Sequence, residues 1–164
     1  MDANLLHCLA TGKAVTGILH FWNQTLGDWY SKKQDTVETA TYGSEFVAAR
    51  IAVDQIEDTR NTFRYLGVPV KGKTHLFGDN SSVITSSTLP QSALRKRHSI
   101  LCYHRVREAV ASNMLTFTFM PGEHNPADVV SKHWGHAQIW PTLRQILFWN
   151  GKGEGAINDD ALPS

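Results

Sequence analysis

The sequence predicts one α/β domain, in which an antiparallel β-meander is followed by strands that alternate with helices. Three observations lead to this class. Runs rich in β-branched and aromatic residues come first, a long stretch with helical spacing of apolar residues follows, and a five-residue run of alternating character comes later in the chain. The 164 residues are enough for one such domain with a substantial core.

The N-terminal part of the chain contains the predicted meander. Residues 14–23 are rich in β-branched and aromatic residues and predict a strand, residues 24–27 predict a turn, and residues 28–31 predict a returning strand. The stretch from the first residue to about Cys8 predicts a further, earlier strand. Three strands would then pair in sequence order.

A long helix is predicted from Val37 to Leu66, because Gly67 and Pro69 are typical of a helix end. One face of this helix carries residues at helical spacing, namely Glu45, Ala49, Ala52, Ile56 and Phe63. Glu45 is the chemical exception on this face. An ionised carboxylate on the core side of a helix is costly unless something compensates it.

The chain after this helix predicts strands and helices in alternation. We expect strands at residues 74–77 and 115–119, a short helix at 81–87, a longer helix at 95–113, and closing helices at 127–134 and 139–149. The domain is expected to cover residues 1–150. The glycine-rich tail, 151–164, has few anchoring residues and is expected to be disordered.

Composition narrows the class of protein. With 41% hydrophobic and 19% charged residues the chain is typical of a globular protein, and no apolar stretch approaches the roughly 20 residues that span a bilayer. Cys8 and Cys102 form no CxxC pair, so neither a disulfide framework nor a structural zinc site is expected, and an intracellular setting is favoured. Because the net charge is only +1, any basic surface for nucleic acid must be local.

Four acidic residues lie at informative places. Asp2 belongs to the first predicted strand, Glu45 to the apolar helix face, Asp79 to the end of a strand, and Asp128 to the first turn of a helix. Taken singly, Asp128 could be a favourable charge at a helix start, Asp79 a turn or cap residue, and Glu45 a member of an ion pair. Asp2 alone carries almost no information. Together they suit phosphodiester hydrolysis, in which two Mg²⁺ ions roughly 4 Å apart are held by carboxylates.

Five segments, in order, carry a family resemblance. Ser31-Lys-Lys-Gln with Tyr42-Gly-Ser-Glu45-Phe resembles the pattern "SKKQ…VxxSTxEAEY", and Asp2-Ala-Asn resembles "DAD". Phe77-Gly-Asp79-Asn80 resembles "CDNxSA", although Phe77-Gly78 replaces the usual approach to the aspartate. The remaining two are Lys96-Arg-His98 with Tyr103-His104-Arg-Val-Arg107-Glu108 ("KHIxxxYHFVRE") and Asn125-Pro-Ala-Asp128-Val-Val-Ser-Lys ("NxADxxTK"). These patterns are those of the ribonuclease H domains of copia-type retrotransposon polyproteins.

The resemblance implies a ribonuclease H-like fold, with a mixed five-stranded sheet of an antiparallel meander and then parallel strands, flanked by helices. It implies cleavage of the RNA strand of RNA–DNA hybrids with two Mg²⁺ ions, for which Mn²⁺ can substitute. Asp2, Glu45, Asp79 and Asp128 would be the catalytic, metal-binding acids, and His124 would assist proton transfer or product release or be a plain surface histidine.

The resemblance also sets expectations for context. A reverse transcriptase domain would lie upstream in the same polyprotein, and the protein would work in the cytoplasm, in virus-like particles or in the nucleus. Only Met1 precedes Asp2, so a shortened first strand is expected. The alternative is a catalytically silent remnant of this fold that binds nucleic acid or protein.

Contacts to a hybrid are expected to reach phosphates, sugars and 2′-hydroxyls. The most basic stretch supplies Lys96, Arg97, His98 and Arg105, either as a phosphate-binding patch or as a solvated helix face. Lys32 and Lys33, in the loop expected before the long helix, and Asn80 are further candidate contacts. Most of the five tryptophans fall at regular strand or helix positions, so core packing is favoured over base stacking.

Overall fold

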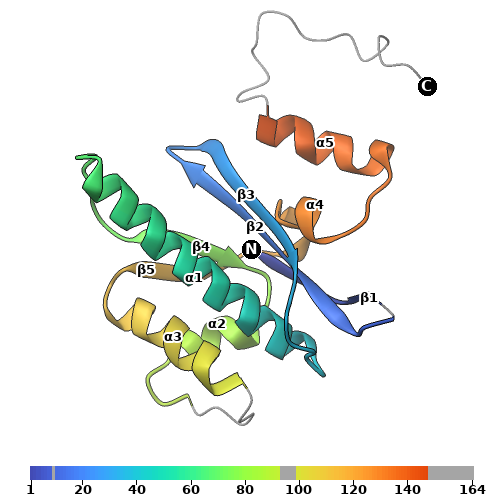
Figure 1. Cartoon of the computed structure of the whole chain (residues 1–164), viewed down its shortest axis with the longest axis horizontal. Helices are drawn as coiled ribbons and strands as arrows, with labels where there is room; N and C mark the ends of the chain where they lie inside the picture. Colours follow the sequence, from blue (N-terminus) through green and yellow to red (C-terminus); the bar gives the residue numbers. More distant parts are fainter. Residues whose placement is uncertain (9, 93–98, 148–164) are drawn as a thin grey trace, which may run out of the picture.

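Five strands form two sheets in the computed structural model, which describes residues 1–8, 10–92 and 99–147 (Figure 1). An antiparallel sheet contains β1 (Asp2–Cys8), β2 (Lys13–Trp22) and β3 (Thr25–Lys33) in that order. A parallel pair contains β4 (Thr74–Gly78) and β5 (Leu115–Phe119). The predicted meander is therefore confirmed, with a third strand that is longer than expected. The tail 151–164 and the basic run 95–98 lie outside the described residues.

The predicted single five-stranded sheet is instead divided between β1 and β4. The residues of β1 pair with the first half of β2, from Lys13 to Gly17. β1 meets β4 at its very start, where the backbone nitrogen of Met1 donates a hydrogen bond of 2.8 Å to the carbonyl of Phe77. This contact is one hydrogen bond and not a ladder, so the strands form a mixed α/β arrangement of three plus two.

The helices follow the predicted order with shifted bounds. They are α1 (Thr41–Tyr65), α2 (Ser81–Thr88), α3 (Ile100–Ala111), the 3-10 turn η2 (Gly122–His124), α4 (Asp128–Ser131) and α5 (His136–Leu147). α1 begins four residues later than expected, and the first closing helix has only one turn. At the end of α1, Gly67 adopts a φ of +74°, the left-handed conformation that glycine tolerates best.

The core lies where α1 packs against the strands. The predicted helix face is confirmed for Glu45, Ala49, Ala52 and Ile56, all of which are buried. Successive residues of a strand point to opposite faces, and β2 shows this alternation. Ile18 belongs to the core cluster on the α1 side. A Cβ placed on the preceding residue, Gly17, would lie 2.7 Å from the carbonyl oxygen of Ala127 at the start of α4. The sheet is therefore covered by α1 on one face and α4 on the other.

The prediction that the tryptophans pack in the core was wrong for three of them. Trp22, Trp29 and Trp134 are 43%, 66% and 42% exposed. Trp22 lies at the end of the β2–β3 hairpin, where its ring meets the edge of Phe63 at a centroid distance of 5.3 Å. Trp149 lies outside the described residues. None of the helices in the described ranges is long and apolar enough to cross a membrane.

Candidate active site

Three of the four predicted acids meet at one place. One carboxylate oxygen each from Asp2, Glu45 and Asp79 lies within 4.8 Å of the others. Asp2 and Glu45 are almost completely buried, with 3% and 4% exposure, and Asp79 is partly buried. We call these residues the acidic triad.

Separate elements bring the acidic triad together. Asp2 is the first residue of β1, Asp79 directly follows β4, and Glu45 lies near the start of α1. The backbone N–H of Ala3 donates a hydrogen bond of 3.1 Å to Oε1 of Glu45, which ties α1 to β1 beside the triad. Because all three elements belong to the core, the packing of the domain itself sets the spacing of the carboxylates.

Gly78, directly before Asp79, allows the close approach of β4 to Met1 and Phe117. A Cβ on Gly78 would lie 2.9 Å from Cε of Met1 and 3.1 Å from the ring of Phe117. Any larger side chain would therefore have to displace the apolar contacts at the point where β1 meets β4. The close packing at this point explains why a glycine directly precedes Asp79.

The positive charges near the acidic triad, the N-terminal ammonium group of Met1 and Lys132, do not offset the burial of its carboxylates. Burial, followed by the nearby charges of Asp2 and Asp79, raises the pKa of Glu45 to about 8. Burial and the charge of Asp2 also raise the pKa of Asp79. Oε2 of Glu45 is buried and has no hydrogen-bond partner among the described residues. A buried polar atom without a partner is uncommon and calls for an explanation.

Asp128, the fourth predicted acid, lies beside the triad but is paired with a cation. Nζ of Lys132 donates a hydrogen bond of 2.6 Å to Oδ2 of Asp128 and lies 4.0 Å from Oδ2 of Asp2. The hydroxyl of Ser131 donates to that same Asp2 oxygen. Burial raises the pKa of Asp128, and the hydrogen bond from Lys132 acts against that rise. The structure therefore brings all four predicted acids into one region, three as the acidic triad and Asp128 as a member of the neighbouring ion pair.

The acidic triad fits a divalent cation. It lines an open cleft of about 450 Å³ whose walls also include Asn80 and Lys132. Mg²⁺ prefers carboxylate and water oxygens and keeps several waters, which an open cleft supplies. A cation would neutralise the mutual repulsion of the carboxylates and would give Oε2 of Glu45 the partner that it lacks.

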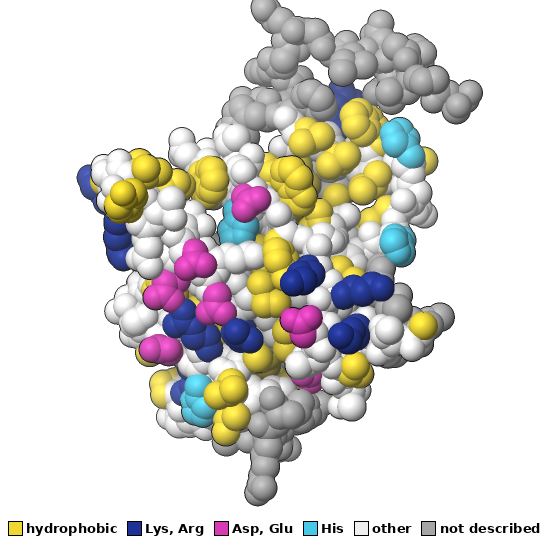
Figure 2. All heavy atoms as spheres, viewed as in Figure 1, with side chains coloured by type: hydrophobic (Ala, Val, Ile, Leu, Met, Phe, Trp, Pro, Cys, Tyr) yellow, Lys and Arg dark blue, Asp and Glu magenta, His cyan; other side chains and the backbone are white. Residues whose placement is uncertain are grey.

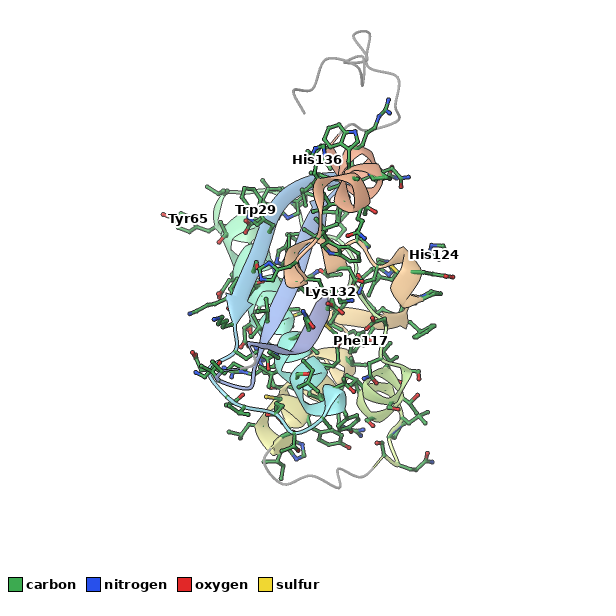
Figure 3. All side chains as sticks on the ribbon, turned by 90° about the vertical axis from the view of Figure 1, so that its right-hand side faces the viewer. Trp29, Tyr65, Phe117, His124, Lys132 and His136 are labelled. Atoms are coloured by element: carbon green, nitrogen blue, oxygen red, sulfur yellow. The ribbon has the colours of Figure 1, made fainter. Side chains whose placement is uncertain are left out.

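Two further predicted residues lie close to the acids. Asn80 caps α2, since its Oδ1 accepts a hydrogen bond of 3.2 Å from the backbone N–H of Val83, and it lines the cleft. His124 lies on η2 with 71% of its side chain exposed, 3.6 Å from Glu123. Figure 3 shows it at the edge of the molecule, with Lys132 near the strands. His124 and Asp128 line a second, neighbouring hollow of about 710 Å³.

The structure does not bring the predicted basic contacts to nucleic acid together as it does the acids. Arg105 donates a hydrogen bond of 2.9 Å to Asp54 and another to Glu57, and so links α3 to α1. Figure 2 shows acidic and basic side chains intermixed on this face. Lys32 and Lys33 are exposed at the end of β3, not in a loop as expected. Lys96, Arg97 and His98 lie outside the described residues.

The chain is similar to the "Retrovirus-related Pol polyprotein from transposon TNT 1-94" of Nicotiana tabacum. The two sequences are 27% identical over 131 residues, which is 80% of this chain and 10% of the relative. The chain therefore spans about a tenth of the length of this relative. No protein-family model matches the chain, and no solved structure matches it. A distant likeness to a segment of a retrotransposon Pol polyprotein is thus supported.

Ser131 and Lys132 close the segment that resembles "NxADxxTK", but neither was predicted to contact the acids, as both do in the structure. A signal for Lys132 was present, because a lysine four residues after Asp128 lies one helical turn away on the same face. No local signal identifies Ser131 as a partner of Asp2, since 129 positions separate the two residues. That contact depends on how α4 packs on the sheet.

Proposed function

We propose that this chain is a ribonuclease H-like domain that hydrolyses the RNA strand of RNA–DNA hybrids with the help of divalent metal ions. The observation that carries the proposal is the acidic triad, three carboxylates within 4.8 Å of one another beside an open cleft. The order of a meander and then parallel strands supports it, as does the likeness to a Pol polyprotein. In that setting the hybrid would come from a reverse transcriptase in the same polyprotein.

The proposed roles follow from the chemistry of the side chains. Asp2, Glu45 and Asp79 would hold Mg²⁺, or Mn²⁺ in its place, and Asp128 would complete the acidic site. Bound at such carboxylates, Mg²⁺ lowers the pKa of a water molecule and stabilises charge on a departing phosphodiester oxygen.

Other side chains would serve the substrate. Asn80 would contact the substrate from the wall of the cleft, and exposed His124 would assist proton transfer or product release. The basic residues Lys32, Lys33, Lys96, Arg97, His98 and Arg105 stay predicted contacts to the hybrid. For Arg105, contact with nucleic acid would compete with its ion pairs to α1.

The test is cleavage of a hybrid labelled on its RNA strand, measured with Mg²⁺ and with EDTA. We expect the wild-type chain to cleave the RNA strand only with Mg²⁺. Asp79→Asn should lower the rate at least about a hundredfold, the scale of loss seen when a charge-stabilising group is removed from an active site. Asp79 is only partly buried, so thermal melting should show an intact fold.

Asp58→Asn is the matched control, because Asp58 is an exposed aspartate on α1, roughly 20 Å along the helix from Glu45. This variant should cleave at the wild-type rate. Cleavage by Asp79→Asn at that same rate would refute the proposal. A different outcome would support the silent remnant: the wild-type chain is inactive, and its melting temperature does not change when Mg²⁺ or Mn²⁺ is added. A bound ion must stabilise the folded state, so an unchanged melting temperature would mean that no ion binds.

A further inference from the structure

Lys132 lies on the boundary between the acidic triad and Asp128. Its Nζ is 2.6 Å from Oδ2 of Asp128 and 4.0 Å from Oδ2 of Asp2, and its side chain is 36% exposed. Lys132 lines the cleft of the triad, whereas Asp128 lines the neighbouring hollow. Figure 3 shows Lys132 beside the strands, on the segment that follows α4. The ammonium group thus stands between the two carboxylates.

The ammonium group of Lys132 lies at one end of the acidic site. Both ends have a buried carboxylate oxygen without a hydrogen-bond partner among the described residues, Oε2 of Glu45 at the triad and Oδ1 of Asp128 at the other end. Between the two ends, Oδ2 of Asp128 and Oδ2 of Asp2 face the same ammonium group. A divalent cation that used Asp2 and Asp128 together would have to occupy the space next to Lys132, and like charges at such distances repel strongly.

We propose that Lys132 is a built-in cation that blocks a second metal site between Asp2 and Asp128, so that the free protein binds one divalent ion, at Asp2, Glu45 and Asp79. This inference rests on the metal site of the proposed function but not on cleavage of any substrate. It differs from the two-ion expectation from the sequence. A second ion would enter only when the ammonium group of Lys132 leaves Asp128.

The test is calorimetric titration of Mn²⁺ into the metal-free chain, without nucleic acid. We expect one bound ion for the wild-type protein. Lys132→Met keeps most of the side-chain length and removes the charge, so it should bind a second ion at least about tenfold more tightly than the wild-type protein does. Lys132→Arg keeps the charge and should again bind one ion.

Two further variants identify the second site. Lys71→Met removes an exposed lysine from the loop before β4 and should leave the titration unchanged. Adding Asp128→Asn to Lys132→Met should remove the second ion, because the carboxylate that would hold it is gone. Circular dichroism on each variant checks that the fold is kept. If Lys132→Met unfolds, Lys132→Arg still tests the proposal, because a second ion bound by Lys132→Arg would contradict the proposed block by the positive charge at this position.

The outcomes separate this inference from the proposed function. Two ions of similar affinity in the wild-type protein, or one ion in both wild type and Lys132→Met, would overturn the role of Lys132 while the metal site stands. No Mn²⁺ binding by any variant would refute the metal site itself, and the role of Lys132 with it.

Discussion

The two halves of the acidic site are held in place by different forces. Asp2, Glu45 and Asp79 lie on β1, α1 and β4, which pack into the core around residues such as Phe46 and Val53, both fully buried. Burial of apolar side chains of this size stabilises a fold by roughly 1.5–3 kcal/mol each. The spacing of the triad is therefore fixed by the same contacts that fold the domain.

Asp128 depends on weaker and more local support. Its helix, α4, has four residues, too few for a stable helix on its own. It is held to the sheet by a hydrogen bond of 2.6 Å from the hydroxyl of Ser31 to the carbonyl of Val130, and by the close approach to Gly17. Trp134 donates a further bond of 2.8 Å to the carbonyl of Asp128. The hydroxyl of Ser131 on α4 also donates to Oδ2 of Asp2. A change that displaces Asp128 should therefore leave Glu45 and Asp79 in place and, within the triad, loosen only this contact to Asp2.

The largest expected effect concerns the buried triad and pH. In the metal-free protein the free energy of unfolding should fall as pH rises from about 4.5 to about 8, the ordinary and the folded pKa of Glu45. Between these values the unfolded chain releases the proton while the folded protein keeps it, so rising pH favours unfolding. At 1.36 kcal/mol per pKa unit, the loss over this whole range is on the order of 5 kcal/mol.

Urea unfolding in EDTA at pH 5 and pH 8 measures this loss. Glu45→Gln cannot ionise and should show most of the pH dependence removed. Glu123→Gln, which changes a glutamate with 78% of its side chain exposed, should behave as the wild-type protein does. Equal slopes for wild type and Glu45→Gln would show that the burial of Glu45 does not govern the stability of the triad.

An intermediate effect is expected where α4 packs on β2. The Cβ of Gly17→Ala would lie 2.7 Å from the carbonyl oxygen of Ala127 and 2.9 Å from the backbone nitrogen of Ser131, so α4 must move away from the sheet. Overpacking of this kind costs about 1–3 kcal/mol. Urea unfolding measures the cost, and amide NMR shifts should change more at residues 128–131 than at residues 45–49.

Gly135→Ala is the control for this substitution, since its Cβ would meet its nearest neighbour at an ordinary 3.7 Å. It should change stability by less than about 0.5 kcal/mol, as surface substitutions usually do. Equal shifts at α1 and α4 in Gly17→Ala would mean that the two halves of the site move as one body.

The elements could be predicted because their signals are local. The helix face through Glu45, Ala49 and Ala52 follows from spacing alone, and the end of α1 from Gly67. The start of α1 was missed: residues 37–40 stay outside the helix, and Glu38 is buried there with its side chain against Gly43, which leaves no room for a Cβ on that residue. The spacing of apolar residues does not predict such a contact.

Pairings between distant segments could not be predicted in the same way. The division of the strands into two sheets depends on how β1 meets β4 at Met1 and Phe77. Arg105 lies in a basic stretch of sequence, yet its neighbours in space are Asp54 and Glu57 of α1. The position of Asp79 at a strand end was predictable, whereas the charge balance around Asp128 required the packing of α4.

The smallest expected effect comes from a single hydrogen bond at the surface. Ser31→Ala removes the bond to the carbonyl of Val130, and because Ser31 is exposed, water can replace its hydroxyl at that carbonyl. The loss of unfolding free energy should be about 0.5–1 kcal/mol. Ser31→Thr keeps a hydroxyl and should restore most of it. Because the triad does not depend on this bond, the affinity for the first Mn²⁺ ion should stay within about twofold of wild type. A large drop in that affinity would show that α4 and the triad are coupled, and that Asp128 contributes to the first metal site after all.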